Sequence, residues 1–416
     1  MPVATESATN RAAVPAAGHA PALSVVGPVA RVASVDAFRG FVMFLMMAEV
    51  LKFSEVAKAL PGNGFWAFLA SQQTHVPWVG CTLHDLIQPS FSFLVGVALP
   101  YSLASRAAQG QSQTRRTLHA FWRAFVLVLL GVFLRSTHSN GTNWTFEDTL
   151  TQIGLGYGFL YLLGLASVRV QVAALFAILI GYWALFALYP LPGPAFDWAS
   201  TGTTADAAER LTGFAAHWNL NTNPAWAFDQ WFLNLFPRET PFTNNGGGYA
   251  TLSFIPTLAT MILGLLAGQL LRTSRNPGQK LCWLLLAGTI GLVAGWGLNA
   301  SGICPVVKRI WTPSWVLFSG GWAFIILAFL YAVIDVGRLR GWAFAFIVIG
   351  MNSIAAYLIA HLFVSFIRAA LPRHLGSAAF HGFGDAYTPF LLGAATLLVE
   401  WLLLLWMYRR KIFLRI

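Results

Sequence analysis

The sequence predicts an all-α, polytopic membrane helix bundle of about ten transmembrane helices. Three observations predict this fold class. Hydrophobic residues make up 57% of the 416 residues and charged residues only 10%, whereas soluble domains carry roughly 25% charged residues. The mean hydropathy is +0.63. The apolar residues also form continuous runs of the length that a bilayer requires, which is roughly 20 residues.

The apolar runs follow one another with polar connections between them. The candidate spans cover residues 35–53, 84–104, 118–136, 149–167, 170–189, 250–272, 281–299, 314–335, 342–366 and 387–408. Residues 1–33 are rich in Ala, Pro and Val, but Pro15, Pro21 and Pro28 interrupt every apolar stretch. We therefore expect a disordered cytoplasmic tail in place of a signal peptide, followed by one transmembrane domain over residues 34–416.

The distribution of Lys and Arg orients the predicted bundle. With the N-terminus inside, the inner connections and span ends carry Arg106, Arg115, Arg116, Arg169, Arg272, Arg275, Lys280, Arg338, Arg340, Arg409, Arg410, Lys411 and Arg415. This bias predicts both termini on the cytoplasmic side of the cell (inner) membrane. Two outer segments, 54–83 and 190–249, are too long to be simple connectors. The second joins the fifth and sixth spans and is predicted to cap an outward-facing site.

Composition excludes several other classes of protein. The net charge of +11 follows from the charge bias of the connections, and the basic residues do not cluster with stacking aromatics as in a nucleic-acid binder. Cys81, Cys282 and Cys304 leave at least one thiol unpaired, so no disulfide framework is predicted. The nine histidines show no paired ligand spacing, so no metal site is predicted either.

Ionisable residues inside the spans are functional candidates by default, because charge in hydrocarbon is costly. They are Arg39, Glu49, Asp85, Arg123, His361 and Glu400. Structural alternatives stay open: Arg39 can extend to the surface, His361 can be a satisfied core histidine, and Glu400 can pair with Arg123 or lie in an oligomer contact. A homodimer therefore stays open. A proton- or ion-coupled transporter would use Glu49, Asp85, Arg123, His361 and Glu400 as a relay.

The segment 74–89, which leads from the first long outer segment into the second span, holds the most informative polar residues. His75 precedes Asp85 by ten residues, so the chain can fold back over the helix start, although spacing alone fixes no contact. A neutral histidine at a membrane mouth accepts a proton near pH 7, as a general base must. Asp85 follows Thr82 by three residues and equally fits a capping box.

Two motifs and several later segments follow a recognisable order. The first span opens with Ser34, Asp36, Arg39 and Gly40, and the second motif contains His75, Trp78, Gly80, Thr82, Asp85 and Leu86, with Phe93 and Gly96 following. Matching segments continue at 151–157, 248–268, 305–315 and 350–353. Over roughly residues 34–408, this order resembles the heparan-α-glucosaminide N-acetyltransferase family and its bacterial relatives.

The resemblance implies transfer of an acetyl group from cytoplasmic acetyl-CoA to the amino group of a sugar outside the membrane, with His75 as the catalytic residue beside Asp85. Such a transfer needs hydrogen-bond donors for an oxyanion, which we expect from Gln152, Asn352, Ser353 or a backbone N–H. It also needs cations for the CoA phosphates, of which Arg39 is one candidate. The alternative for Asn352 and Ser353 is hydrogen bonding between helices.

The sequence departs from the family pattern in two places. The lysosomal enzyme of the family has an asparagine near the outer end of the first span, and the nearest polar residue here is Glu49, offset by about one position. We expect Glu49 to be the partner of His75. The lysosomal enzyme also has an additional N-terminal span and lumenal region, which we expect this chain to lack, so the acceptor stays open. An O-acetyltransferase of cell-envelope glycans is a further alternative.

Overall fold

The computed structural model describes residues 32–203 and 210–414, and within them every named element is helical. Residues 1–31 of the predicted tail lie outside the described residues, and Ala33 already begins the first helix. The one extended pairing in the described chain is an isolated antiparallel bridge between Val79 and Val307. The all-α prediction is therefore confirmed.

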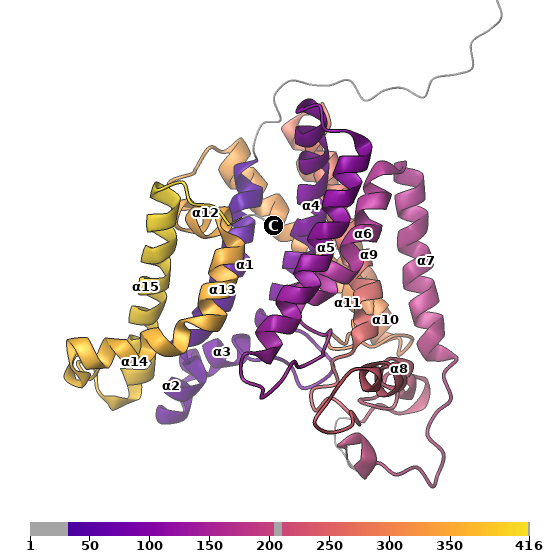
Figure 1. Cartoon of the computed structure of the whole chain (residues 1–416), viewed down its shortest axis with the longest axis horizontal. Coiled ribbons are helices and arrows are strands. Elements are labelled where there is room, and N and C mark those ends of the chain that lie inside the picture. Colours follow the sequence, from indigo (N-terminus) through magenta and orange to yellow (C-terminus); the bar gives the residue numbers. More distant parts are fainter. Residues whose placement is uncertain (1–31, 204–209, 415–416) are drawn as a thin grey trace, which may run out of the picture. The chain divides into compact units, whose positions relative to one another are not determined.

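Helices occupy each of the predicted spans, and shorter helices occur in the segments between them. Figure 1 shows their arrangement. The α-helices are α1 (Ala33–Met47), α2 (Phe53–Ala59), α3 (Gly64–Gln72), α4 (Ile87–Ala108), α5 (Gln113–Ser136), α6 (Thr149–Leu165), α7 (Val168–Ala187), α8 (Pro224–Phe232), α9 (Phe254–Arg272), α10 (Pro277–Ala300), α11 (Pro313–Leu330), α12 (Phe344–Met351), α13 (Ser353–Leu362), α14 (Val364–Leu375) and α15 (Thr388–Arg409). Short 3₁₀ turns are η1 (Ala48–Leu51), η2 (His84–Leu86), η3 (Ala199–Thr201), η4 (Gly213–Trp218), η5 (Leu233–Leu235), η6 (Thr251–Ser253), η8 (Ser377–Phe380) and η9 (Asp385–Tyr387), and η7 (Tyr331–Val336) is π-helical.

Seven helices of the described chain are long and apolar enough to cross a membrane, in agreement with an integral membrane protein. They contain α4, α5, α7, α9, α10, α11 and α15. An eighth span results if α12 and α13, which are bent by 83° at Asn352, are counted together. The remaining two predicted spans correspond to α1 and α6, which have 15 and 17 residues. At about 1.5 Å per residue, each is shorter than the hydrocarbon core of about 30 Å.

The break in the predicted span 342–366 has a local cause. Asn352 leaves the helical conformation (φ −134°, ψ 43°), and its amide group is used by the C-terminal segment. Its Nδ2 donates to the carbonyl of Ile412 (3.0 Å), and its Oδ1 accepts from the backbone N–H of Leu414 (3.0 Å). The predicted span is therefore divided into α12 and α13 at Asn352, whose side chain binds the segment that follows α15, and α14 begins within the last residues of the predicted span.

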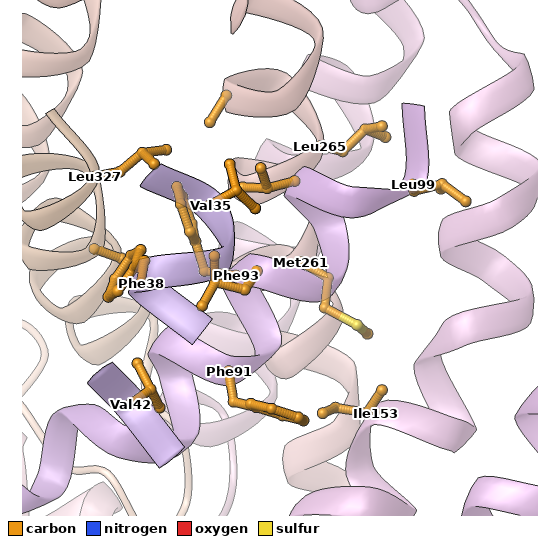
Figure 2. Packing of buried hydrophobic residues seen from close by; sticks show 14 of the residues in the cluster. Val35, Phe38, Val42, Phe91, Phe93, Leu99, Ile153, Met261, Leu265 and Leu327 are labelled. Atoms are coloured by element: carbon orange, nitrogen blue, oxygen red, sulfur yellow. The ribbon is translucent and has the colours of Figure 1, made fainter. Parts of the chain in front are cut away.

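The core centres on α4, which packs closely against α9 and also contacts α1 and α11. Figure 2 shows Phe93 of α4 among Phe38, Met261 and Leu327 from three other helices. The close approach of α4 and α9 depends on small residues, because a Cβ at Gly96 would overlap the backbone of Met261 and one at Gly264 would overlap the backbone of Phe93. Small residues at such crossings allow membrane helices to pack without a hydrophobic driving force between them.

We expect Gly264→Ala to destabilise the bundle by about 1–3 kcal/mol, because the added methyl group forces α4 and α9 apart. Gly181→Ala in α7 is the matched control, since a Cβ there meets nothing within 4 Å and alanine raises helix propensity by up to ~1 kcal/mol. Denaturant or thermal unfolding in detergent measures both. Equal stability of the two variants would contradict the packing argument.

Candidate functional site

Asp85 organises the entrance to α4. Its Oδ2 accepts hydrogen bonds from the backbone N–H of Thr82 (3.1 Å), the hydroxyl of Thr82 (3.0 Å) and the backbone N–H of Val76 (3.2 Å). The carboxylate is 1% exposed. The predicted capping role of Asp85 therefore applies to one of its two carboxylate oxygens, Oδ2. The hydrogen bond from Val76 to the same oxygen holds the preceding loop folded back over the helix start.

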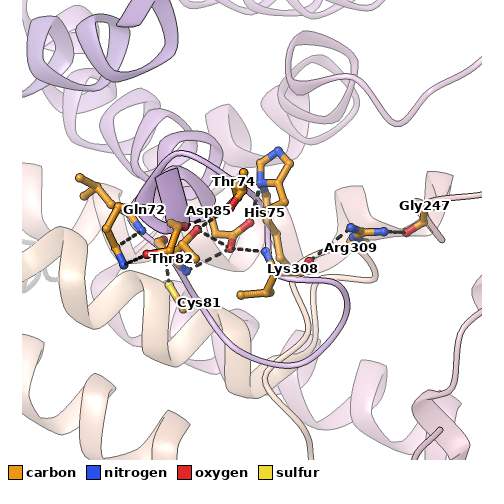
Figure 3. Close-up of polar contacts among 12 residues, drawn as sticks. Gln72, Thr74, His75, Cys81, Thr82, Asp85, Gly247, Lys308 and Arg309 are labelled. Carbon is orange, nitrogen blue, oxygen red and sulfur yellow. Dashed lines mark hydrogen bonds and ion pairs between the residues drawn. The ribbon is translucent and has the colours of Figure 1, made fainter. Parts of the chain in front are cut away.

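The other oxygen of Asp85 fixes the histidine. His75 Nδ1 lies 2.7 Å from Asp85 Oδ1, and Figure 3 shows the ring with its second nitrogen turned away from the carboxylate. A carboxylate only accepts hydrogen bonds, so Nδ1 carries the proton in this contact. Nε2 of a neutral His75 is then the nitrogen with a free lone pair, which is the state that a general base or nucleophile requires.

A buried lysine completes this cluster. Lys308 Nζ lies 3.3 Å from Asp85 Oδ1 and 3.2 Å from His75 Nδ1, and the side chain is 5% exposed. Burial lowers the pKa of Lys308 to about 8, although the neighbouring Asp85 carboxylate raises it. An ammonium group only donates, so Lys308 leaves Asp85 as the acceptor for the Nδ1 proton of His75. Lys308 thus compensates a buried charge and restricts the histidine to one orientation.

Lys308 reaches the cluster through a tertiary contact between two loops. The bridge between Val79 and Val307, extended by a hydrogen bond from Gly80 N–H to the Val306 carbonyl (3.0 Å), places segment 305–309 against segment 74–82. Gly80 has φ +123°, a backbone conformation that other residues rarely adopt. Arg309 adds a second connection, because its guanidinium donates to the carbonyls of Val76 (3.3 Å) and Gly247 (2.7 Å).

The segment between α7 and α9 covers this end of the bundle. Trp78 Nε1 donates to the carbonyl of Trp218 (2.9 Å), and both indoles are buried with Phe186 of α7. Figure 1 shows α8 at the same end of the helices as α2 and α3. The loop that carries His75 is therefore held between the bundle and the covering segment.

His75 lines a cavity of about 500 Å³, called here the outer cavity. Its other lining residues come from α1, η1, η2, α4, α5, α6, α13 and three connections: Met43, Met46, Glu49, His84, Ile87, Gln88, Phe91, Leu134, Arg135, Thr137, His138, Glu147, Asp148, Thr149, Tyr249, Lys308, Tyr357 and His361. The ring centroids of His75 and His84 are 4.5 Å apart. The cavity is thus polar around the histidine.

Acidic residues line another part of the outer cavity. Glu147 accepts a hydrogen bond from Asn245 Nδ2 (2.6 Å) and lies 3.5 Å from Arg135 Nη2. Burial raises the pKa of Glu147 to about 7, against the lowering effect of Arg135. Asp148 caps α6 through the Leu150 N–H (2.8 Å). Together with Glu49, these carboxyl groups give the outer cavity the means to bind ammonium and hydroxyl groups.

A second cavity of about 330 Å³, called here the inner cavity, is cationic. Arg39, Arg106 and Arg123 line it, and no Asp or Glu occurs among its described lining residues. Arg123 Nη1 contacts the Tyr157 hydroxyl (3.3 Å), whereas its Nε is buried without a hydrogen-bond partner among the described residues. Guanidinium groups suit phosphate geometry, so this cavity has the chemistry of an anion site.

The seven predicted site residues separate into three groups. His75, Asp85 and Glu49 lie at or beside the outer cavity, but no direct hydrogen bond joins Glu49 to His75 in the described chain. Arg39 and Ser353 line the inner cavity. Gln152 and Asn352 line neither cavity: Gln152 Nε2 donates to the carbonyls of Phe146 (2.7 Å), Thr251 (3.2 Å) and Ala250 (3.4 Å), and Asn352 holds the C-terminal segment.

Many cavity residues lie outside the predicted set of site residues, and three of them are cations that bear on the chemistry: Lys308, Arg106 and Arg123. Lys308 belongs to the Pro-Val-Val-Lys segment, which is part of the resemblance to the acetyltransferase family. That resemblance was the available sequence signal for a role of Lys308. From the sequence, Arg106 is assigned only to the charge bias of the inner connections. Arg123 is considered there as one member of an ion pair with Glu400. In the structure, Arg123 contacts Tyr157, and Glu400 of α15 is buried with both carboxyl oxygens unpaired among the described residues.

Comparison of the sequence with known proteins shows which proteins the chain is similar to. No family model matches the chain. It is similar to the heparan-alpha-glucosaminide N-acetyltransferase of Homo sapiens, with 27% identity over 380 residues that cover 81% of this chain, and to that of Mus musculus, with 24% identity over 367 residues and 79%. The chain spans about half the length of these relatives, 53% in each case. The two matches support membership of this chain in the heparan-alpha-glucosaminide N-acetyltransferase family.

Proposed function

We propose that the protein is a transmembrane acetyltransferase that moves an acetyl group from cytoplasmic acetyl-CoA to the amino group of a sugar on the extracytoplasmic side. The observation that carries this proposal is a histidine that is fixed by a buried carboxylate and lines a polar cavity. The two relatives are named as N-acetyltransferases of a glucosaminide, which agrees in reaction class and acceptor type.

His75 acts as the general base in this proposal. Nε2 takes a proton from the acceptor amine as the amine nitrogen attacks the thioester carbonyl. The C–N bond forms, the C–S bond breaks, and the thiolate of CoA leaves and receives a proton. Asp85 holds the ring through Nδ1 and stabilises the imidazolium that forms transiently, and Lys308 balances the carboxylate charge while His75 is neutral.

The inner cavity supplies the donor side. Arg39, Arg106 and Arg123 present guanidinium groups to the phosphates of CoA, and Ser353 lies on the same cavity wall. Of the three side chains expected to donate to the oxyanion, Ser353 is the one on a cavity, because the amides of Gln152 and Asn352 already serve backbone groups. A backbone N–H near His75 is the alternative donor.

The outer cavity supplies the acceptor side. An amino sugar brings an amine and several hydroxyl groups, and Glu49, Glu147 and Asp148 accept hydrogen bonds from such groups. In this arrangement Glu49 acts with His75 by orienting the acceptor amine, since no hydrogen bond joins the two side chains directly. The positive-inside distribution of Lys and Arg supports an orientation in which the inner cavity and both termini are on the cytoplasmic side.

We expect His75→Ala to lower acetyl transfer by about 10²–10⁴-fold, because the proton acceptor is lost. The assay supplies acetyl-CoA and glucosamine to purified protein, follows free thiol and identifies the sugar product. His381→Ala is the matched control: His381 also lies 2.7 Å from an aspartate, Asp385, but this pair is exposed and lines neither cavity.

Full activity of His75→Ala would remove His75 from the mechanism. A product acetylated on oxygen when N-acetylglucosamine is supplied, with none from glucosamine, would favour the O-acetyltransferase. Thiol release in neither case, combined with ion-dependent uptake of solute into vesicles, would favour a transporter.

We expect activity to fall as pH rises through about 8, because Lys308 is charged below its lowered pKa and neutral above it. A neutral amine accepts hydrogen bonds, so the Nδ1 proton of His75 then has a second acceptor and the ring loses its unique orientation. The other groups that act on Lys308 are Asp85, Arg309 and Cys81, and burial raises the pKa of Cys81 to about 12.

Lys308→Arg is expected to move this alkaline decline to higher pH, because a guanidinium stays charged above pH 12. Lys308→Met is expected to lower activity across the whole pH range. The measurement is kcat between pH 6 and 10 with glucosamine held saturating (about four pH units, wide enough for one titration). An alkaline decline that stays at the same pH in Lys308→Arg would assign it to another group.

A further inference from the structure

The outer and inner cavities have one lining residue in common, which is Phe91 of α4. We propose that the Phe91 side chain is the barrier between the acceptor and donor compartments, and that the thioester arm of the donor displaces it to reach His75. The role as a barrier rests on geometry alone, whereas the displacement by a thioester arm rests on the proposed function.

The helices show that the two cavities lie end to end. Along α4, Ile87 and Gln88 line the outer cavity and Leu94, Val95 and Ala98 line the inner one. These residues recur at helical spacing on one face of α4, with Phe91 between the two sets. One continuous face of a single helix therefore runs past both cavities, and Phe91 stands at their junction.

Four other helices repeat this division. On each of them, one residue lines the inner cavity and a nearby residue lines the outer cavity. In that order, the pairs are Arg39 and Met43 on α1, Leu127 and Leu134 on α5, Leu150 and Thr149 on α6, and Ile354 and Tyr357 on α13. The cavities are thus enclosed by the same five helices and are stacked along them. The junction on each helix is at most about two turns long, so a single large side chain spans much of the separation.

Phe91 suits a barrier in size and in mobility. Phe91 is 9% exposed, and Figure 2 shows the ring extending from α4 toward Ile153 of α6. A phenylalanine ring swings about two side-chain torsions without movement of the backbone. The charges on the two sides differ: the inner cavity has three arginines and no described carboxylate, whereas the outer cavity has three carboxyl groups (Glu49, Glu147 and Asp148) together with two cations, Arg135 and Lys308.

A barrier at this position has a chemical consequence. Without it, water from the outer cavity reaches a thioester held in the inner cavity. Water oxygen then attacks the carbonyl carbon, the C–O bond forms, the C–S bond breaks, and acetate and CoA are released with the proton passing to the thiolate. Loss of the ring therefore increases thiol release in the absence of any acceptor, while an enlarged ring obstructs passage of the acyl group.

The first test compares Phe91→Ala, Phe91→Leu and Phe91→Trp in the full chain. We expect acceptor-independent release of CoA thiol to rise several-fold in Phe91→Ala and less in Phe91→Leu. Phe91→Trp is expected to lower transfer to glucosamine by about tenfold, with CoA affinity unchanged, because the acyl group no longer reaches a productive position. Phe93→Ala is the control, since it removes the same atoms from α4, and Phe93 packs on Phe324 and lines neither cavity.

The second test needs no enzymatic activity. Cys81, Cys282 and Cys304 are replaced by serine, Met46→Cys is introduced on the wall of the outer cavity, and a membrane-impermeant maleimide is applied to either side of sealed vesicles. With Phe91 present, labelling is expected from the outer-cavity side alone. With Phe91→Ala, labelling from the other side is also expected, and Phe93→Ala should leave the one-sided pattern unchanged.

The outcomes separate this inference from the proposed function. One-sided labelling that becomes two-sided in Phe91→Ala supports the barrier even if no acetyl transfer is found with any sugar. Labelling that is two-sided with Phe91 present, or that stays one-sided in Phe91→Ala, overturns the barrier. Transfer activity with an unchanged rate of acceptor-independent thiol release in Phe91→Ala and an active Phe91→Trp overturns the displacement step.

Discussion

The site depends on one buried charge. Asp85 is almost fully enclosed, and a carboxylate in such surroundings is stable only when its oxygens are paired and hydrogen-bonded. Five donors meet this requirement: two from Thr82, one from Val76, one from His75 and one from Lys308. Because removal of one partner from a buried pair costs about 3–5 kcal/mol, the loop, the histidine and the lysine are held in place by the same carboxylate.

The requirement of Asp85 for partners also explains the contacts farther away. Lys308 follows Asp85 by 223 positions in the sequence. The bridge between Val79 and Val307 and the cap of α11 at Thr312 hold the segment that places Lys308 beside Asp85. Trp78, in the same loop as His75, is buried against Trp218 of the covering segment. The position of the His75 ring is therefore determined by segments from three separate parts of the chain. Its nearest partner, Asp85, is nevertheless only ten residues away in the sequence.

The sequence predicted the helical class and the positions of the long apolar helices, because continuous apolar runs of about 20 residues are typical of membrane spans. It did not predict the shorter helices α2, α3, α8 and α14. It also indicated His75 and Asp85 by their position at a helix entrance. It did not predict the break at Asn352 or the use of Gln152, since the type of a polar residue does not reveal whether its amide meets a substrate or a backbone carbonyl. Lys308 was missed as a site residue because its contact is a tertiary one.

Transfer between the two sides of a membrane requires polar groups near the middle of the bilayer without an open pore. Two cavities stacked along the same helices satisfy both conditions, because polar and charged side chains line each cavity and Phe91 lies at their junction. The short α1 and α6 fit this plan: each lines both cavities, and a helix enclosed by neighbours at its ends need not span the full hydrocarbon thickness. In the proposed mechanism, the acetyl group passes one side chain, that of Phe91, between the inner and the outer cavity.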